Sequence, residues 1–105
     1  FDEELYLSLV RLGDSCLHIE EPASSIVFWL DAIDERPDRP EAYACLAKLF
    51  ESIGKNVLAF KFASDGAVCA PSKDRLFVDY GAKQLCREIR DRIADAAIDQ
   101  KQAKK

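Results

Sequence analysis

Three small residues, Gly13, Ala47 and Gly81, recur along this chain at a fixed interval of 34 positions, and Pro37 and Pro71 repeat at the same interval. A period of this length is typical of arrays built from pairs of antiparallel helices, in which each pair buries its apolar face against the next one. Such arrays usually hold partners and seldom carry out chemistry. The period therefore predicts an all-α solenoid of five or six helices whose role is binding.

Apolar residues recur at spacings of three and four along five segments, as expected for amphipathic helices. The expected helices are Asp2–Ile19, Ala23–Glu35, Glu41–Ile53, Val57–Ala70 and Arg75–Gln100. The apolar faces of the first two are assigned to Leu5, Leu9, Leu12, Cys16 and Ile19, and to Ile26, Val27, Leu30 and Ile33. Gly54 is expected as a left-handed stop. No period-two run predicts a strand, and whether the last segment is one helix or two stays open.

The bulk composition excludes several classes of function. At 105 residues the chain is one small domain, and its net charge of −4 argues against a nucleic-acid binder. No apolar run approaches the roughly 20 residues that span a bilayer. The four cysteines form no Cys-x-x-Cys pair and there is one histidine, so neither a zinc site nor any other cofactor is expected. The absence of methionine and of a signal peptide indicates a fragment of a longer cytoplasmic protein with reduced thiols.

Residues of the central segment fill a specific pattern of aromatic, small and proline positions. In order along the chain they are Tyr43, Leu46, Ala47, Phe50, Ala59, Ala63, Gly66 and Pro71. On these residues the segment 40–73 resembles a tetratricopeptide repeat. The resemblance implies weaker copies over 6–39 and 74–105, the last of them a degenerate end cap. It also implies a role in helix packing for seven residues: Gly13, Trp29, Ala47, Phe50, Ala59, Gly66 and Gly81.

A narrower resemblance rests on four runs of sequence: Glu4–Gly13, Arg36–Ala42, Leu58–Ala63 and Leu76–Asp79. On these runs the first three quarters of the chain looks like the helical-repeat region that accompanies family 2 glycosyltransferase domains in some bacterial and viral proteins. It resembles the repeat region and not the transferase, because the sequence has no Asp-x-Asp metal motif and no nucleotide-binding strand–turn–helix. The fragment itself is therefore expected not to be an enzyme, although its parent protein could be a glycosyltransferase.

In repeat arrays of this kind the first helix of each pair lines a concave face that contacts the partner. The residues expected on that face are Leu7, Val10, Asp14, Leu17, Glu41, Ala44, Lys48, Glu51, Val78 and Ala82. Some family members use this face to grip a terminal carboxylate with cationic and amide side chains. Val10, Asp14 and Ala44 do not suit such a clamp, so that mode is not expected. The face could equally be solvated or covered by other parts of the parent protein.

The remaining candidates have plainer explanations than a catalytic or metal site. His18 has no nucleophile placed beside it by any recognisable motif, and Asp31, Asp34 and Glu35 are expected to form a solvated helix end. Trp29 is expected in the core or, if exposed, as an interface anchor. The apolar stripe of residues 93, 94, 97 and 98 is expected to pack on the preceding repeat, or alternatively to pair with another chain.

These observations predict a non-catalytic protein-interaction or scaffolding module. Its partner is expected to be a protein, a peptide or the rest of its own parent chain, and neither a nucleic acid nor a membrane. Two alternatives remain open. The segment could form part of a glycosyltransferase enzyme, or it could be a structural module that self-associates through Phe28–Trp29 or through its C-terminal surface.

Overall fold

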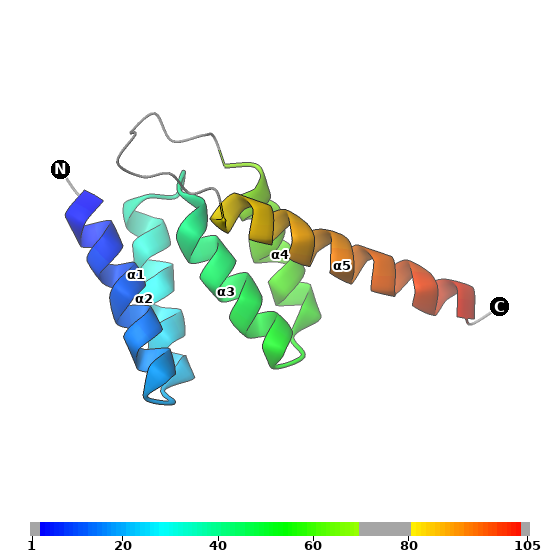
Figure 1. Ribbon diagram of the computed structural model, residues 1–105, viewed down its shortest axis with the longest axis horizontal. Helices are drawn as coiled ribbons and strands as arrows, with labels where there is room; N and C mark the ends of the chain where they lie inside the picture. The colour runs from blue at the N-terminus through cyan, green and yellow to red at the C-terminus, as the bar shows by residue number, and fades with distance from the viewer. Residues whose placement is uncertain (1–2, 70–80, 104–105) are drawn as a thin grey trace.

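The chain forms five helices and no strand in the residues that its structure, a computed structural model, describes, which are 3–69 and 81–103. The helices are α1 (Glu3–His18), α2 (Pro22–Glu35), α3 (Pro40–Ser52), α4 (Asn56–Ala67) and α5 (Ala82–Ala103). The pairs α1–α2 and α3–α4 stand side by side, and α5 packs on α3 and α4 before it extends away from them (Figure 1). This arrangement confirms the expected all-α class and is compatible with a solenoid of antiparallel pairs.

The first helix of each pair ends in the same way, and the two ends lie 34 residues apart. At the end of α1 the amide of Glu21 donates to the carbonyl of Cys16 at 2.8 Å, around Glu20 with φ 61°. At the end of α3 the amide of Lys55 makes the equivalent bond, again 2.8 Å, around Gly54 with φ 80°. Both ends are Schellman motifs, in which a left-handed residue lets a late amide bond back to the helix. The expected stop at Gly54 is confirmed, and the 34-residue period is a repeat of geometry as well as of residue type.

The period fails in the third copy. The Schellman residues Glu20 and Gly54 would recur at Glu88, yet α5 runs unbroken through that position. Without glycine or proline nearby, the chain continues as a helix, so the described part of this segment is one helix and not two. The expected start of that helix at 75, together with Val78, lies outside the described residues. The fourth helix, expected to reach Ala70, ends at Ala67.

The first pair is held together by a tryptophan that lies against a glycine. Trp29 is 2% exposed, and a Cβ placed on Gly13 would lie 2.6 Å from its Cδ1 and 2.7 Å from its Cε2. The indole Nε1 donates to the Val10 carbonyl at 3.1 Å, and the buried Ser25 hydroxyl donates to the Gly13 carbonyl at 2.6 Å. Both bonds reach the backbone of α1 because Gly13 has no side chain in the way. Gly13 and Trp29 therefore occupy the close helix contact that the register assigns to them.

In the second pair smaller residues occupy the equivalent positions, and a side chain of α5 completes their packing. Ala47 and Ala63, the counterparts of Gly13 and Trp29, are fully buried together with Ile89 of α5. Gly66 allows the next close approach, because a Cβ there would meet the Cys86 sulfur and lie 2.8 Å from the Tyr43 Cβ. The residues of this pair that were expected in packing positions are all buried: Ala47, Phe50, Ala59 and Gly66.

Gly81 does not share this role. It is exposed, and a Cβ placed on it would have no atom of the described residues within 4 Å. Its carbonyl accepts the first hydrogen bond of α5, from the Leu85 amide at 2.8 Å. Within the described residues Gly81 therefore makes no close helix contact and precedes the first turn of α5, and its expected packing role stays a prediction.

The buried faces of α1 and α2 also differ from the apolar stripes expected from the sequence. In the described part of α1 Tyr6 and Gly13 are buried, whereas Leu5 and Leu12 are 45% and 46% exposed. In α2 the residues Ser25, Trp29 and Ala32 are buried, while Val27 is 56% exposed. The buried contact therefore combines two aromatic side chains with small residues, while Leu9, Ile26 and Ile33 of the expected stripes pack against it partly buried.

None of the described helices is both long enough and apolar enough to cross a lipid bilayer. The longest, α5, is polar along most of its length. Its exposed charged side chains are Arg87, Glu88, Asp91, Arg92, Asp95 and Asp99.

Gly13→Ala should destabilise the fold, because the new methyl group would collide with an indole ring that its hydrogen bond to Val10 holds in place. We expect a loss of roughly 1–3 kcal/mol in the free energy of unfolding, even though alanine favours a helix more than glycine does. Urea denaturation followed by circular dichroism measures it. Gly81→Ala is the matched control and should change stability by less than about 1 kcal/mol; equal losses in both variants would contradict the assignment.

Candidate functional site

A groove of about 210 Å³ runs between α1 and α3 on the face where the sequence places a partner. Its lining residues come from both pairs of helices and are Asp14, Leu17, Trp29, Cys45, Lys48, Leu49 and Ser52. Three of the ten residues expected to contact a partner, Asp14, Leu17 and Lys48, therefore lie around one groove. The repeat register explains why they meet, because Asp14 and Lys48 are equivalent positions 34 residues apart in neighbouring first helices.

The groove lining next to α1 includes Trp29 of α2, whose side chain is held in place by contacts with α1. Its ring is held against Gly13 and by the hydrogen bond to the Val10 carbonyl. Leu49 is 7% exposed and packs in the same core cluster as Trp29. The buried part of the lining is therefore apolar and well packed, and it supports the exposed residues at 14, 17 and 48 above it.

The α3 side of the groove is positioned by a tyrosine from α1. The fully buried Tyr6 hydroxyl accepts a hydrogen bond from the Ala42 amide at 3.2 Å and donates one to Oε2 of Glu41 at 3.0 Å. Ala42 is in the first turn of α3, where amides lack partners within the helix, and the local cap residue Arg39 makes no side-chain cap there. Tyr6 therefore caps α3 from another helix. Burial, and then the Glu41 carboxylate, raise the pKa of Tyr6 far above its usual range, so the hydroxyl stays protonated.

The polar groups of the groove carry both signs of charge. Asp14 lies on one wall and Lys48 on the other, and Nε2 of His18 lies 3.6 Å from Oδ2 of Asp14 on the solvent side. Burial raises the pKa of the Cys45 thiol to about 11, so at neutral pH it is a protonated, weak hydrogen-bond donor and a poor nucleophile. The arrangement suits the binding of a ligand with apolar and charged parts.

Most of the other residues expected on the partner face are used within the fold. Leu7 and Val10 are half-buried against the core, and Glu41 binds Tyr6. Ala44 is 4% exposed and lies in a cluster with Tyr43, Cys69 and Cys86, against which Ala82 also packs. Ala44 is therefore buried within the chain, and its expected contact with a partner stays a prediction. Val78 lies outside the described residues.

Glu51, the last of these residues, forms an ion pair with α5. Its two carboxylate oxygens accept from Nε and Nη2 of Arg92 at 2.9 and 2.6 Å, and these hydrogen bonds lower the pKa of Glu51 below its usual range. This bidentate pair links α3 to α5 at their partly solvated surface. Glu51 is therefore a contact between helices of this chain and is not part of the groove.

Several residues that shape the site are not singled out by the sequence pattern. Tyr6, Ser25 and the 2%-exposed Arg39 are buried at the contacts between helices. Tyr6 could have been found, because it lies seven residues before Gly13 and so shares its helix face. Ser25 could not have been found from the sequence, because a serine in an apolar stripe does not indicate which backbone carbonyl will accept its hydrogen bond.

The minor candidates remain outside any site. Asp31 and Asp34 are exposed and Glu35 is half-buried at the end of α2. In the described ranges no three His, Cys, Asp or Glu side chains lie close enough together to hold a metal ion. The four cysteines are not joined in disulfides, and two of them, Cys69 and Cys86, are buried.

Tyr6→Phe should destabilise the protein by roughly 1–3 kcal/mol, because it leaves a buried amide at the start of α3 without its acceptor. Tyr43→Phe is the matched control. The Tyr43 hydroxyl donates to the Pro37 carbonyl at 3.1 Å in a less buried position, so its loss should have the smaller effect. Chemical denaturation of both variants gives the comparison; a larger loss in Tyr43→Phe would contradict the capping role.

Glu51→Gln should lower stability at neutral pH by up to about 1 kcal/mol, since both partners of the ion pair are partly solvated. Because the pKa of Glu51 is lower in the folded state, the stabilisation is present above its unfolded pKa and is lost as the pH falls through its folded pKa. Unfolding curves of the two proteins should therefore differ at pH 7 and converge as the pH falls through the folded pKa of Glu51. A difference that persists at low pH would contradict this origin.

Comparison of the chain with models of protein families, with curated proteins and with solved structures finds no match.

Proposed function

We propose that this chain is a non-catalytic protein-interaction domain of the tetratricopeptide-like type, which holds a peptide or protein segment in the groove between α1 and α3. The observation that carries the proposal is the meeting of Asp14, Leu17 and Lys48 around one groove. The 34-residue register alone predicts these positions on a partner face. A structural role within the chain does not account for their exposure, whereas residues 41, 44 and 51 of the same predicted face do have such a role.

The chemistry of the groove indicates what kind of segment it would hold. At about 210 Å³ it is smaller than the pockets of roughly 300–1,000 Å³ that take cofactors or drug-sized ligands. It suits one apolar side chain of a longer peptide, placed over Trp29 and Leu49. The carboxylate of Asp14 and the ammonium of Lys48 would pair with charged residues of opposite sign on either side of that anchor, which gives the peptide a direction.

The resemblance to repeat regions beside family 2 glycosyltransferase domains extends this proposal. In that setting the segment bound in the groove would belong to a catalytic domain, or to an acceptor protein that this chain positions. The groove itself would then act as a scaffold. The support for this extension is the sequence runs that carry the resemblance, among which 4–13 forms much of α1.

Selection from a displayed library of random peptides tests the proposal directly. Peptides selected on the native chain should contain an apolar residue flanked by charges of both signs. Titration of the isolated chain with such a peptide should shift the amide resonances of α1 and α3 near Asp14, Leu17 and Lys48. Asp14→Lys and Lys48→Glu should each weaken binding roughly tenfold or more, since each places like charges in contact.

Charge reversals outside the groove are the controls. Asp31→Lys on α2 and Lys55→Glu before α4 change exposed charges of the same kinds and should leave peptide affinity within about twofold. The proposal fails if no peptide is enriched above background, or if the control variants weaken binding as much as the groove variants.

A further inference from the structure

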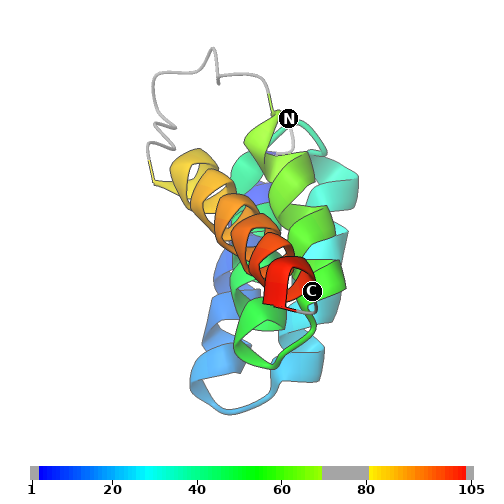
Figure 2. The ribbon, with the colours of Figure 1, turned by 90° about the vertical axis from the view of Figure 1, so that its right-hand side faces the viewer.

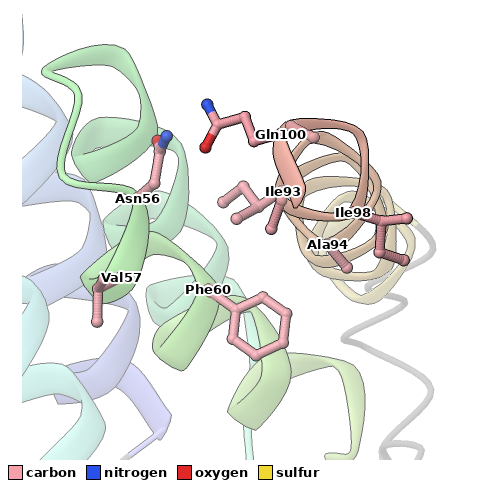
Figure 3. Close-up of a pocket in the computed structure, with 9 residues that line it drawn as sticks. Asn56, Val57, Phe60, Ile93, Ala94, Ile98 and Gln100 are labelled. Atoms are coloured by element: carbon pink, nitrogen blue, oxygen red, sulfur yellow. The ribbon is translucent and has the colours of Figure 1, made fainter. Parts of the chain in front are cut away.

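A second and larger groove of about 520 Å³ opens between α4 and the outer half of α5, and it shares no lining residue with the α1–α3 groove. Figure 3 shows Val57 and Phe60 on α4 and Ala94 and Ile98 on α5, and in Figure 2 the far end of α5 faces the viewer. None of the described residues that line this larger groove is titratable. A groove whose affinity for a ligand changes with pH is therefore the one between α1 and α3.

A histidine lies beside the carboxylate of the α1–α3 groove. His18 is the last residue of α1 and follows Asp14 by four positions, so the two side chains share one face of the helix. Nε2 of His18 lies 3.6 Å from Oδ2 of Asp14, and the two side chains are 79% and 63% exposed. Because both are open to solvent, the imidazole and the cation of a bound peptide can reach the same carboxylate.

The position opposite His18 on α3 holds no charge. It is Ser52, which follows His18 by 34 residues, lines the groove and donates its hydroxyl to the Leu49 carbonyl at 2.6 Å. The charged groups around His18 come from three places, and they are Arg11 and Asp14 on α1, Glu20 and Glu21 in the turn after it, and Lys48 on α3. The first part of α2, residues 22–30, has no charged side chain.

The imidazole is the group at this groove that suits a change of charge near neutral pH. Histidine is the side chain that ordinarily gains or loses its charge between pH 5 and 8, and the chain contains one histidine. The Cys45 thiol in the groove lining stays protonated over that range, because burial raises its pKa to about 11.

We propose that His18 makes peptide binding in the α1–α3 groove dependent on pH, by competing with the cation of the peptide for the Asp14 carboxylate. The inference rests on the proposed function of this groove. At higher pH the imidazole is neutral, and the carboxylate is available to the peptide. At lower pH the imidazolium pairs with Asp14 in its own chain and repels the peptide cation, so binding weakens as the pH falls.

Fluorescence anisotropy of a labelled peptide tests the proposal. The peptide comes from the library selection and contains an arginine, an apolar anchor and an acidic residue, but no histidine. Its dissociation constant on the native chain should rise roughly two- to fivefold between about pH 8 and about pH 5.5, since exposed ion pairs are weak. His18→Gln should remove this change. His18→Lys should bind weakly at both pH values, because its charge is then present throughout.

Two controls separate the role of His18 from other effects of pH. The first is the same peptide with its arginine replaced by glutamine, which has no cation for which the imidazole competes. Its affinity should not fall with pH. The second moves the histidine: Lys61 on α4 is 66% exposed and does not line the α1–α3 groove. Adding Lys61→His to His18→Gln should not restore the pH dependence.

Calorimetry gives a readout that does not depend on comparing affinities. Because the proton and the peptide compete, linkage requires that peptide binding release protons from His18 where that residue is partly protonated. Binding enthalpies measured at about pH 6.5 in two buffers of different ionisation enthalpy should therefore differ for the native chain. They should agree for His18→Gln.

The results distinguish this inference from the proposed function of the groove. If the peptide binds equally well at both pH values, binds more tightly at low pH, or keeps its pH dependence in His18→Gln, the competition by His18 is wrong while the groove still binds peptide. If no peptide binds at any pH, the proposed function and this inference are both wrong.

Discussion

The hydroxyl of Tyr6 connects the first helix pair to the second, and the shape of the interaction face depends on that connection. It accepts from the Ala42 amide and donates to the Glu41 carboxylate, so it caps α3 from α1 and binds the charge that lies beside the cap. A buried amide without an acceptor costs roughly 1–3 kcal/mol, which holds this geometry firmly. Both bonds lie at the start of α3, and Asp14 and Lys48 line the groove further along the same two helices.

The two helix pairs fill equivalent packing positions with side chains of different size, and the positions of the two grooves follow from that difference. The first pair combines no side chain at Gly13 with the largest one at Trp29, and its core continues into the second pair through Leu46, Leu49 and Phe50. The second pair places alanines at both positions and needs Ile89 of α5 to fill the remaining space. The α1–α3 groove therefore forms between repeats of the same register, whereas the α4–α5 groove forms where α5 runs straight through the position at which earlier helices turn.

The sequence by itself determined much of this architecture. Apolar spacings of three and four residues predict the helical class and the first four helices to within a few residues, and Gly54 predicts the turn after the third helix. The 34-residue period assigns the close approach to Gly13 and brings Asp14 and Lys48 to one face, because equivalent positions of stacked repeats line up. Residue spacing carries this information directly, since a helix of 3.6 residues per turn sets which side chains share a face.

Only the tertiary structure decided which face of each helix is buried, and where α5 runs. In α1 Tyr6 and Gly13 are buried, Leu9 is partly buried and Leu5 and Leu12 are exposed, because only part of the apolar stripe faces a neighbouring helix. Ala44 packs in a cluster that includes Cys86 of α5, and Glu51 pairs with Arg92 of α5. Whether a residue is buried depends on which helix lies opposite it, and the local spacing of apolar residues does not specify that helix.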